Sequence, residues 1–330
     1  MRVLDVTRAR NRVERLPQRF LPVIATFAVF VLTFGTGAVR YDGFASAQIF
    51  TNLFVDNAFL IVLAVGMTFV ILTGGIDLSV GAVAALSTMI AAATLQAGWP
   101  PLMSVLAVLV TGTTLGLLMG LVIHVFDVQP FIVTLAGMFL ARGLCLLISV
   151  ESISITDPAF RTMATGTITL TDGVTLTYSV LIALAAVLVA VYVLHLTRFG
   201  RTVYAVGGSA SSARLMGLPT DRVRVGVYAV SGFCSALGGL LFSLYMLSGY
   251  GLHGVGMELD VIAAVVIGGT LLTGGVGHVA GSVLGVLVLG TVQTLISFEG
   301  SLSSWWTRIV IGVLLLAFIM FQRLIVRRTE

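Results

Sequence analysis

The sequence predicts an all-α polytopic membrane protein with about ten transmembrane helices, and three observations lead to this fold class. Hydrophobic residues make up 58% of the 330 residues, and the mean hydropathy is +1.10. Only 10% of the residues are charged, whereas soluble domains contain about 25%. The apolar residues also fall in runs of about 20, which is the length a helix needs to cross a bilayer. We therefore expect one helical bundle in lipid, without a soluble domain.

Ten apolar runs mark the expected spans. They lie near residues 21–39, 55–73, 78–96, 102–123, 131–150, 178–196, 225–248, 259–272, 278–297 and 304–322. The eighth run is short and forms either a full span or a half-helix. The predicted organisation is a cytoplasmic segment over residues 1–20, a single transmembrane domain over 21–322 and a cytoplasmic tail over 323–330.

The arginines predict the orientation of the bundle. All 18 basic residues are Arg, and positive charge is retained in the cytoplasmic loops next to span ends. Arginines crowd both the first 20 residues and the C-terminal tail, so both termini are expected in the cytoplasm, in agreement with an even number of spans. Residues 197–224 are also rich in Arg and fall inside, whereas the acidic segment 151–177 falls outside. Trp305 and Trp306 would then lie at the outer headgroup level.

The residue types that the chain lacks exclude several functions. Without any Lys, the phosphate-binding motif G-x-x-x-x-G-K-[ST] cannot exist, so another subunit has to bind ATP if ATP drives this protein. Neither G-x-S-x-G nor H-E-x-x-H occurs and the four His are scattered, so no catalytic residue is expected. Cys145 and Cys234 lie in apolar runs, which indicates buried thiols rather than a disulfide or a metal site. The net charge of +4 comes from arginines at span ends, so the expected partner is membrane lipid and no nucleic acid.

A short capped helix is predicted in the cytoplasmic loop over residues 197–224. Ser209 can accept from the first free backbone N–H groups, Gly217 supplies a left-handed residue after the last turn, and Pro219 prevents continuation. The helix is either a docking element for a partner or an ordinary connector. The candidate segment consists of Gly207, Gly208, Ser209, Ala210, Ser211, Ser212, Ala213, Arg214, Leu215, Met216 and Gly217.

Polar residues within or beside the apolar runs are candidates for a hydrated path through the membrane. Arg142 lies well inside the fifth run, and a charge there costs about 2.5 to 3.5 kcal/mol on insertion scales. It therefore either hydrogen-bonds a polar substrate or forms a structural ion pair. Glycines four residues apart, as in Gly112 and Gly116 or Gly281 and Gly285, predict close helix packing instead. The candidate path residues are Asp77, Arg142, Tyr245, Glu258, Asp260 and Gln293.

An internal echo occurs at an offset of 200 residues. TGGIDLSVGA at 73–82 and TGGVGHVAGS at 273–282 share four of ten positions. Each copy separates two apolar runs on the predicted cytoplasmic side. The echo is either a duplicated half-helix break or a coincidence in a chain with 37 Gly.

Several of these motifs resemble one transporter family. ILTGGIDLSVG (71–81), FIVTLAGMFLARG (131–143), the Gly207–Gly217 loop and VVIGGTLLTGGVG (265–277) are similar to ribose-family ABC importer permeases, and the resemblance covers nearly the whole chain. Within the family, residues 254–277, 301–309 and 150–155 look most like the membrane subunits of galactofuranose importers. The resemblance implies a bundle like that of the vitamin B12 importer, the type II-like ABC permease fold, in the bacterial inner membrane.

The resemblance also implies a set of partners and a role for the capped helix. The partners are a periplasmic sugar-binding protein, a second permease, similar but different in the galactofuranose system, and an ABC ATPase subunit that binds ATP and Mg. No cofactor is expected in this chain. The Gly207–Gly217 segment would be the coupling helix that docks on the ATPase. The family's Glu-Ala-Ala stretch aligns with Ala210, Ser211 and Ser212, so its Glu is absent here.

Two other transport classes predict different behaviour. An ion-coupled secondary sugar transporter would also have about ten spans and broken helices, with Asp77 or Glu258 as coupling carboxylates, and it would need no ATPase. A channel would contain rings of pore charges, and no repeated charged ring is visible in the sequence. The sequence thus favours ATP-driven alternating access with no covalent step in this chain.

Overall fold

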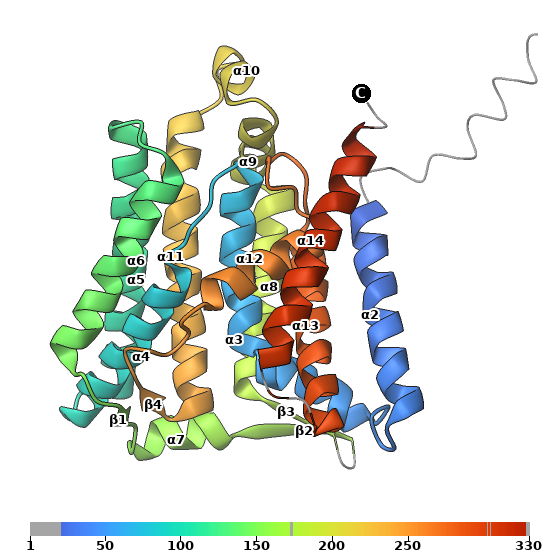
Figure 1. Cartoon of the computed structure of the whole chain (residues 1–330). Coiled ribbons are helices and arrows are strands. Elements are labelled where there is room, and N and C mark those ends of the chain that lie inside the picture. Colours follow the sequence, from blue (N-terminus) through green and yellow to red (C-terminus); the bar gives the residue numbers. More distant parts are fainter. Residues whose placement is uncertain (1–20, 172–173, 302, 304, 328–330) are drawn as a thin grey trace, which may run out of the picture.

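The computed structural model describes residues 21–171, 174–301, 303 and 305–327 and is an almost wholly helical bundle (Figure 1). Its first half contains α2 (Leu21–Arg40), α3 (Ala47–Leu72), α4 (Val80–Gln96), α5 (Pro101–Val125) and α6 (Pro130–Ile148). A connecting segment follows with β1 (Ile153–Ser154), α7 (Pro158–Thr165), β2 (Thr167–Thr171) and β3 (Val174–Thr177). The second half contains α8 (Tyr178–Leu196), α9 (Arg198–Gly208), α10 (Ala210–Leu215), α11 (Thr220–Met246), β4 (Ser248–Gly249), α12 (Met257–Ile267), α13 (Val279–Glu299) and α14 (Trp305–Arg327). The predicted segment 1–20 and residues 328–330 of the predicted tail lie outside the described residues.

Each of the ten predicted apolar runs folds as a helix, but the helices differ in length. Among the described residues, those long and apolar enough to cross a membrane are the seven helices α2, α3, α5, α6, α8, α11 and α13. The helix α4 and the apolar part of α14 are shorter. With 11 residues, α12 extends about 16 Å at 1.5 Å per residue, about half of the hydrocarbon core. The short run at 259–272 is therefore a half-helix.

The helices α3 and α11 form the centre of the bundle. Nearly all of α3 from Leu60 onward is buried, whereas only 17 to 22% of the apolar stretches of α2, α6 and α8 is buried. Close approach between α5 and α11 depends on glycines, because a Cβ on Gly112 would lie 2.8 Å from the carbonyl oxygen of Gly232. In the same way, a Cβ on Gly285 would lie 3.0 Å from the backbone nitrogen of Gly268. The expected packing role of the glycine pairs is confirmed.

Two non-helical segments enter the bundle, and they contain the two copies of the sequence echo. After α3, the chain turns back into the bundle before α4 begins, and a second turn joins α12 to α13 (Figure 1). Backbone of this kind is tolerated at membrane depth only where protein buries it. The two copies touch, because a Cβ on Gly274 would lie only 2.8 Å from the backbone nitrogen of Gly74. The backbone N–H of Gly275 also donates to the carbonyl oxygen of Leu72, just before the first copy, at 2.9 Å. The echo therefore marks one place in space that both halves of the chain reach.

One end of the bundle contains short elements that the sequence pattern did not predict. There β1 pairs antiparallel with β4, β2 pairs with β3, and Asp157 caps α7 by accepting from the N–H of Phe160 at 2.8 Å. At the same end, Tyr41 donates to Glu299, which also binds Arg40 at 2.8 Å. The hydrogen bond with Glu299 raises the pKa of Tyr41. These contacts join α2 to the end of α13.

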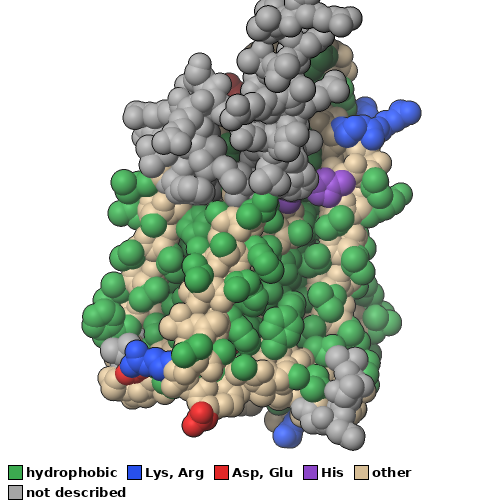
Figure 2. All heavy atoms as spheres, turned by 90° about the vertical axis from the view of Figure 1, so that its right-hand side faces the viewer, with side chains coloured by type: hydrophobic (Ala, Val, Ile, Leu, Met, Phe, Trp, Pro, Cys, Tyr) green, Lys and Arg blue, Asp and Glu red, His purple; other side chains and the backbone are tan. Residues whose placement is uncertain are grey.

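The surface agrees with insertion in a membrane. Figure 2 shows a broad hydrophobic face between edges where charged side chains gather. Figure 1 places the start of α2 and the C-terminal end of α14 on the side that carries α10, while α7 and the strand pairs lie on the other side. The described part of the chain thus begins and ends on one side of the bundle.

Candidate functional site

A polar cavity opens between α3, α12, α13 and α14. It has two adjoining sections of about 460 and 510 Å³, within the range of small-molecule sites. Both sections are lined by Asn57, Leu60, Asp260, Gln293 and Ser297. A cavity with several polar side chains in an otherwise apolar bundle is a suitable place for a hydrophilic solute.

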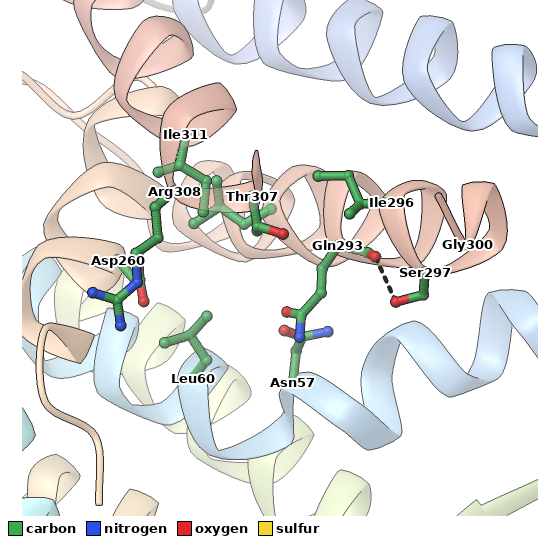
Figure 3. A pocket seen from close by; sticks show the side chains of 11 residues that line it. Asn57, Leu60, Asp260, Gln293, Ile296, Ser297, Gly300, Thr307, Arg308 and Ile311 are labelled. Atoms are coloured by element: carbon green, nitrogen blue, oxygen red, sulfur yellow. Dashed lines mark hydrogen bonds between the residues drawn. The ribbon is translucent and has the colours of Figure 1, made fainter. Parts of the chain in front are cut away.

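The first section brings amide and charged groups together (Figure 3). The side chains of Asn57 and Gln293 lie next to each other, and Asp260 points toward Arg308, with which it interacts electrostatically. The Asn57 amide donates to the carbonyl oxygen of Leu53 at 2.9 Å, which fixes the amide group. Both faces of the section therefore offer donors and acceptors, the functional groups that hydroxyl-rich ligands need.

The second section adds aromatic rings from the middle of α3 and the end of α11. Phe59 and Phe242 pack with ring centres 4.7 Å apart, and Tyr245 follows on the same helix as Phe242, 6.5 Å away. Asp56 faces the hydroxyl group of Tyr245. Apolar rings beside a few placed polar groups are typical of small-molecule sites.

The structure separates the predicted path residues into two groups. Tyr245, Asp260 and Gln293 line the cavity. Asp77 is only 1% exposed and lies elsewhere, where its carboxyl group accepts from the N–H and hydroxyl groups of Ser79 at 2.9 and 2.6 Å and from Ser231 at 2.7 Å. This carboxyl group holds the turn into α4 against α11, which is a structural function.

Arg142 and Glu258 also lie outside the cavity lining. The guanidinium group of Arg142 donates to the carbonyl oxygens of Gly251 and His253 at 2.6 and 2.7 Å, so it holds the loop that precedes α12. Glu258 interacts with Arg142 electrostatically, but no ion pair among the described residues joins the two side chains. Within the part of the chain that the structure describes, Oε2 of Glu258 is buried without a hydrogen-bond partner.

The sequence interpretation missed Asn57, Asp56 and Arg308. Asp56 and Asn57 interrupt the apolar run of α3, and Arg308 follows Trp305 and Trp306 at the start of the last run. A search for every polar residue within four positions of a run's start would have found them. Their convergence with Asp260 depends on how α3, α12 and α14 pack.

A second candidate site is α10, which projects from the bundle (Figure 1). The hydroxyl of Ser209 accepts from the N–H of Ser212 at 3.2 Å, and Gly217 has a φ of +74°, so both predicted caps are present. Leu215 is 90% exposed and Met216 68% exposed. These apolar side chains form the tip, which suits a protein contact.

The surroundings of α10 differ from the single predicted helix. Gly207 and Gly208 are the last residues of a separate helix, α9, and Met216 is the residue after the last turn of α10. Arg214 forms an exposed ion pair with Asp221 at 3.1 Å. Beside α10 lies a groove of about 480 Å³ lined by Asp127, Val206, Ala210, Ser211, Arg214, Leu215, Thr220 and Arg224.

The described residues contain no group of three or more His, Cys, Asp or Glu side chains that could hold a metal ion. The structural features that distinguish this bundle are the internal polar cavity and the exposed capped helix. Together with the fold they define a membrane permease.

Comparisons with known proteins agree with this class. Residues 49–319 match the family described as the permease component of the branched-chain amino acid transport system. The inner membrane ABC transporter permease protein YjfF of Escherichia coli (strain K12) is 48% identical over 93% of both chains. The fructose import permease protein FruG of Bifidobacterium longum is 41% identical over 94% of this chain and 92% of its own. The ribose import permease protein RbsC of Bacillus subtilis is 34% identical over 97% of both. No solved structure gives a significant match.

The chain therefore belongs to this family of ABC transporter permeases, and its Escherichia coli relative is named as an inner membrane protein. The relatives are membrane subunits of transporters, which agrees with the expectation that this chain is not an enzyme. The family match also favours an ABC permease over the ion-coupled alternative.

Proposed function

We propose that this chain is one of two paired permeases in a binding-protein-dependent ABC importer that moves a monosaccharide across the inner membrane. The observation that carries the proposal is the internal cavity lined by Asn57, Asp260, Gln293 and Arg308. The similarity to relatives named as ribose and fructose import permeases supports a sugar as the substrate class. Amide and charged side chains facing one space can exchange hydrogen bonds with several hydroxyl groups at once.

Galactofuranose is the proposed sugar. The segments that resemble galactofuranose permeases, residues 254–277 and 301–309, contribute Met257, Asp260, Thr307 and Arg308 to the cavity lining. The resemblance and the cavity thus involve the same residues. Fructose and ribose are the competitors to test, because relatives carry those names.

In the proposed orientation, α10 and both chain termini face the cytoplasm. The concentration of Arg on that side and the exposure of Trp305 and Trp306 at the opposite end of α14 support it. The ATPase subunit would bind ATP and Mg and receive α10, while the periplasmic sugar-binding protein would dock on the side of α7. The second permease is proposed to be a similar but different chain.

The mechanism is alternating access. A ligand shifts an equilibrium only by binding one state better than the other, so ATP binding would favour one arrangement of the ATPase pair. The helix α10 would transmit that arrangement to the bundle. The cavity would then be exposed to the two sides in turn. The permease itself holds the sugar by hydrogen bonds and forms no covalent bond.

Reconstitution tests the proposal. The permease pair, a candidate ATPase and a candidate binding protein are placed in liposomes, and uptake of radiolabelled galactose, which contains the furanose form, is compared with that of ribose and fructose. We expect concentrative galactose uptake that requires ATP and persists with an uncoupler. Uptake by this chain alone that an uncoupler abolishes would contradict the ABC assignment, and preferential ribose or fructose uptake would contradict the substrate.

A further inference from the structure

Three segments that are distant in the sequence meet beside the start of α10. Gly74 follows α3, Gly207 lies in the last turn of α9, and Gly274 and Gly275 lie between α12 and α13. We call these four residues the glycine junction. The hydrogen bond from the N–H of Gly275 to the carbonyl oxygen of Leu72, 2.9 Å long, joins two of the segments.

The segments of the glycine junction are in contact through their backbones. A Cβ on Gly207 would overlap the carbonyl oxygen of Leu72 and would lie 3.0 Å from Cα of Gly275. A Cβ on Gly274 would lie 2.8 Å from the backbone nitrogen of Gly74 and 3.1 Å from Cα of Gly207. Side chains can change rotamer to absorb a small displacement, whereas backbones in direct contact cannot. A movement of α9 therefore has to displace the segment before α13.

Side chains of α8 and α9 strengthen the same connection. The hydroxyl of Tyr204 on α9 donates to the carbonyl oxygen of Gly277 at 2.7 Å. The ring of His195, at the end of α8, stacks on His278 with ring centres 5.5 Å apart. Besides the glycines, the segment 268–278 is thus held against α9 by Tyr204 and against the end of α8 by His195.

The glycine junction lies between the two candidate functional sites. On one side, Ser209 alone separates α9 from α10. On the other side, the segment 268–278 begins directly after α12, which carries Asp260 into the cavity. The ion pair of α10 with α11, Arg214 to Asp221, is exposed on both partners, and exposed pairs contribute little. The backbone contact is the more rigid of the two connections.

We propose that Gly207 and Gly275 are positioning residues that transmit movement of α10 to the half-helix α12 and so to the cavity. The proposal rests on the proposed function, because it takes α10 as the element that contacts the ATPase. On this proposal, the close contact between α9 and the second copy of the echo couples ATP hydrolysis to sugar movement.

Two helical glycines allow a matched test. A Cβ on Gly207 meets backbone atoms, whereas no described atom lies within 4 Å of a Cβ on Gly143, an exposed residue of α6. G207A, G143A and the wild type are compared in the complete transporter with ATPase and binding protein. Co-purification of the ATPase, ATP hydrolysis and uptake of radiolabelled galactose are measured, and the result is the number of sugars moved per ATP hydrolysed.

We expect G207A to bind and support the ATPase but to lower the ratio of sugar moved to ATP hydrolysed about tenfold, within the usual range of coupling between sites. G143A is expected to stay within about twofold of the wild type, as for an exposed position without new contacts. A wild-type ratio in G207A, or equal losses in both variants, overturns the proposal. Failure of the wild type to move any of the three sugars would instead overturn the proposed function.

A third variant decides the case in which G207A does not assemble. Y204F removes the hydrogen bond to Gly277 without adding an atom. We expect it to lower the same ratio about fivefold, the factor by which loss of one neutral hydrogen bond shifts an equilibrium. An unchanged ratio in Y204F overturns the proposal whatever the behaviour of G207A.

Discussion

The cavity and the glycine junction lie in the same bundle and depend on opposite features of their residues. In the cavity, polar side chains such as Asn57 and Gln293 form part of the lining. At the junction, Gly207 and Gly274 have no side chain, and three backbones occupy the space. A cavity of this kind can change its ligand by exchanging side chains, whereas any larger residue at the junction has to displace backbone. Substitutions should therefore alter affinity in the first region and folding or coupling in the second.

The largest expected effect is that of Gly274→Ala. Gly274 has a φ of +87°, and its Cβ would contact the backbone of Gly74. Left-handed strain costs about 1 to 2 kcal/mol, and overpacking adds about 1 to 3 kcal/mol. Gly217 has a φ of +74° with no described atom within 4 Å of its Cβ, so Gly217→Ala isolates the strain. Thermal unfolding of the purified permease in detergent measures both, and equal losses of stability would contradict the crowding of the junction.

Asp77→Ala should follow in size. The substitution removes three hydrogen bonds and leaves the hydroxyl of Ser231 without its acceptor, which we expect to lower the free energy of unfolding by about 2 to 4 kcal/mol. Ser231→Ala removes one of these bonds and should cost about 1 kcal/mol. The double variant should lose less than the sum, because the two residues interact directly. Additive losses in thermal unfolding would show that the contact does not stabilise the bundle.

Gln293→Leu should change affinity and leave stability nearly intact. The substitution keeps the volume of the side chain and removes its amide group from the cavity. Loss of about 1 kcal/mol of hydrogen bonding would raise the KM for galactose uptake about fivefold. Thr111→Val is the control, because that hydroxyl bonds to Ala107 within α5. If the KM of Gln293→Leu equals that of the control, the amide group does not contact the sugar.

Leu215→Ser should have the smallest effect on the permease itself. The side chain is 90% exposed, so the free energy of unfolding should change by less than about 0.5 kcal/mol. Burial of a Leu side chain in an interface contributes about 1.5 to 3 kcal/mol, so the ATPase should bind at least about tenfold more weakly. Val150→Ser changes an equally apolar residue, 71% exposed, at the other end of the bundle. Equal ATPase binding by the two variants would exclude Leu215 from the contact.

The capped helix α10 is a feature that the local sequence pattern predicts correctly. Ser209 and Gly217 act on backbone groups within a few residues of themselves, so their caps could be predicted from the sequence and are present. The separate helix α9 was not predicted, although Arg198–Gly208 is a helix of 11 residues. Its glycine-ended sequence has no long apolar run, and the helix is stabilised by packing on the end of α3 and on the segment 268–278.

The surroundings of the candidate path residues are a feature that the local sequence pattern does not predict. Asp77, Arg142 and Asp260 are all charged groups beside apolar runs, and the sequence treats them alike. In the structure, Asp77 and Arg142 bind the protein's own backbone and hydroxyl groups, whereas Asp260 faces the cavity and Arg308. The difference arises from the partners that other helices supply, and no spacing within one run encodes them.

By itself, the sequence determined the membrane-embedded helical fold, the runs that become helices and the caps of α10. Each of these depends on transfer of apolar residues into lipid or on hydrogen bonds between near neighbours. Only the tertiary structure decided that α12 is a half-helix, that Asn57, Asp260, Gln293 and Arg308 share one cavity, and that Gly207 contacts Gly275. Those relations join residues far apart in the chain and are set by the close packing of whole helices.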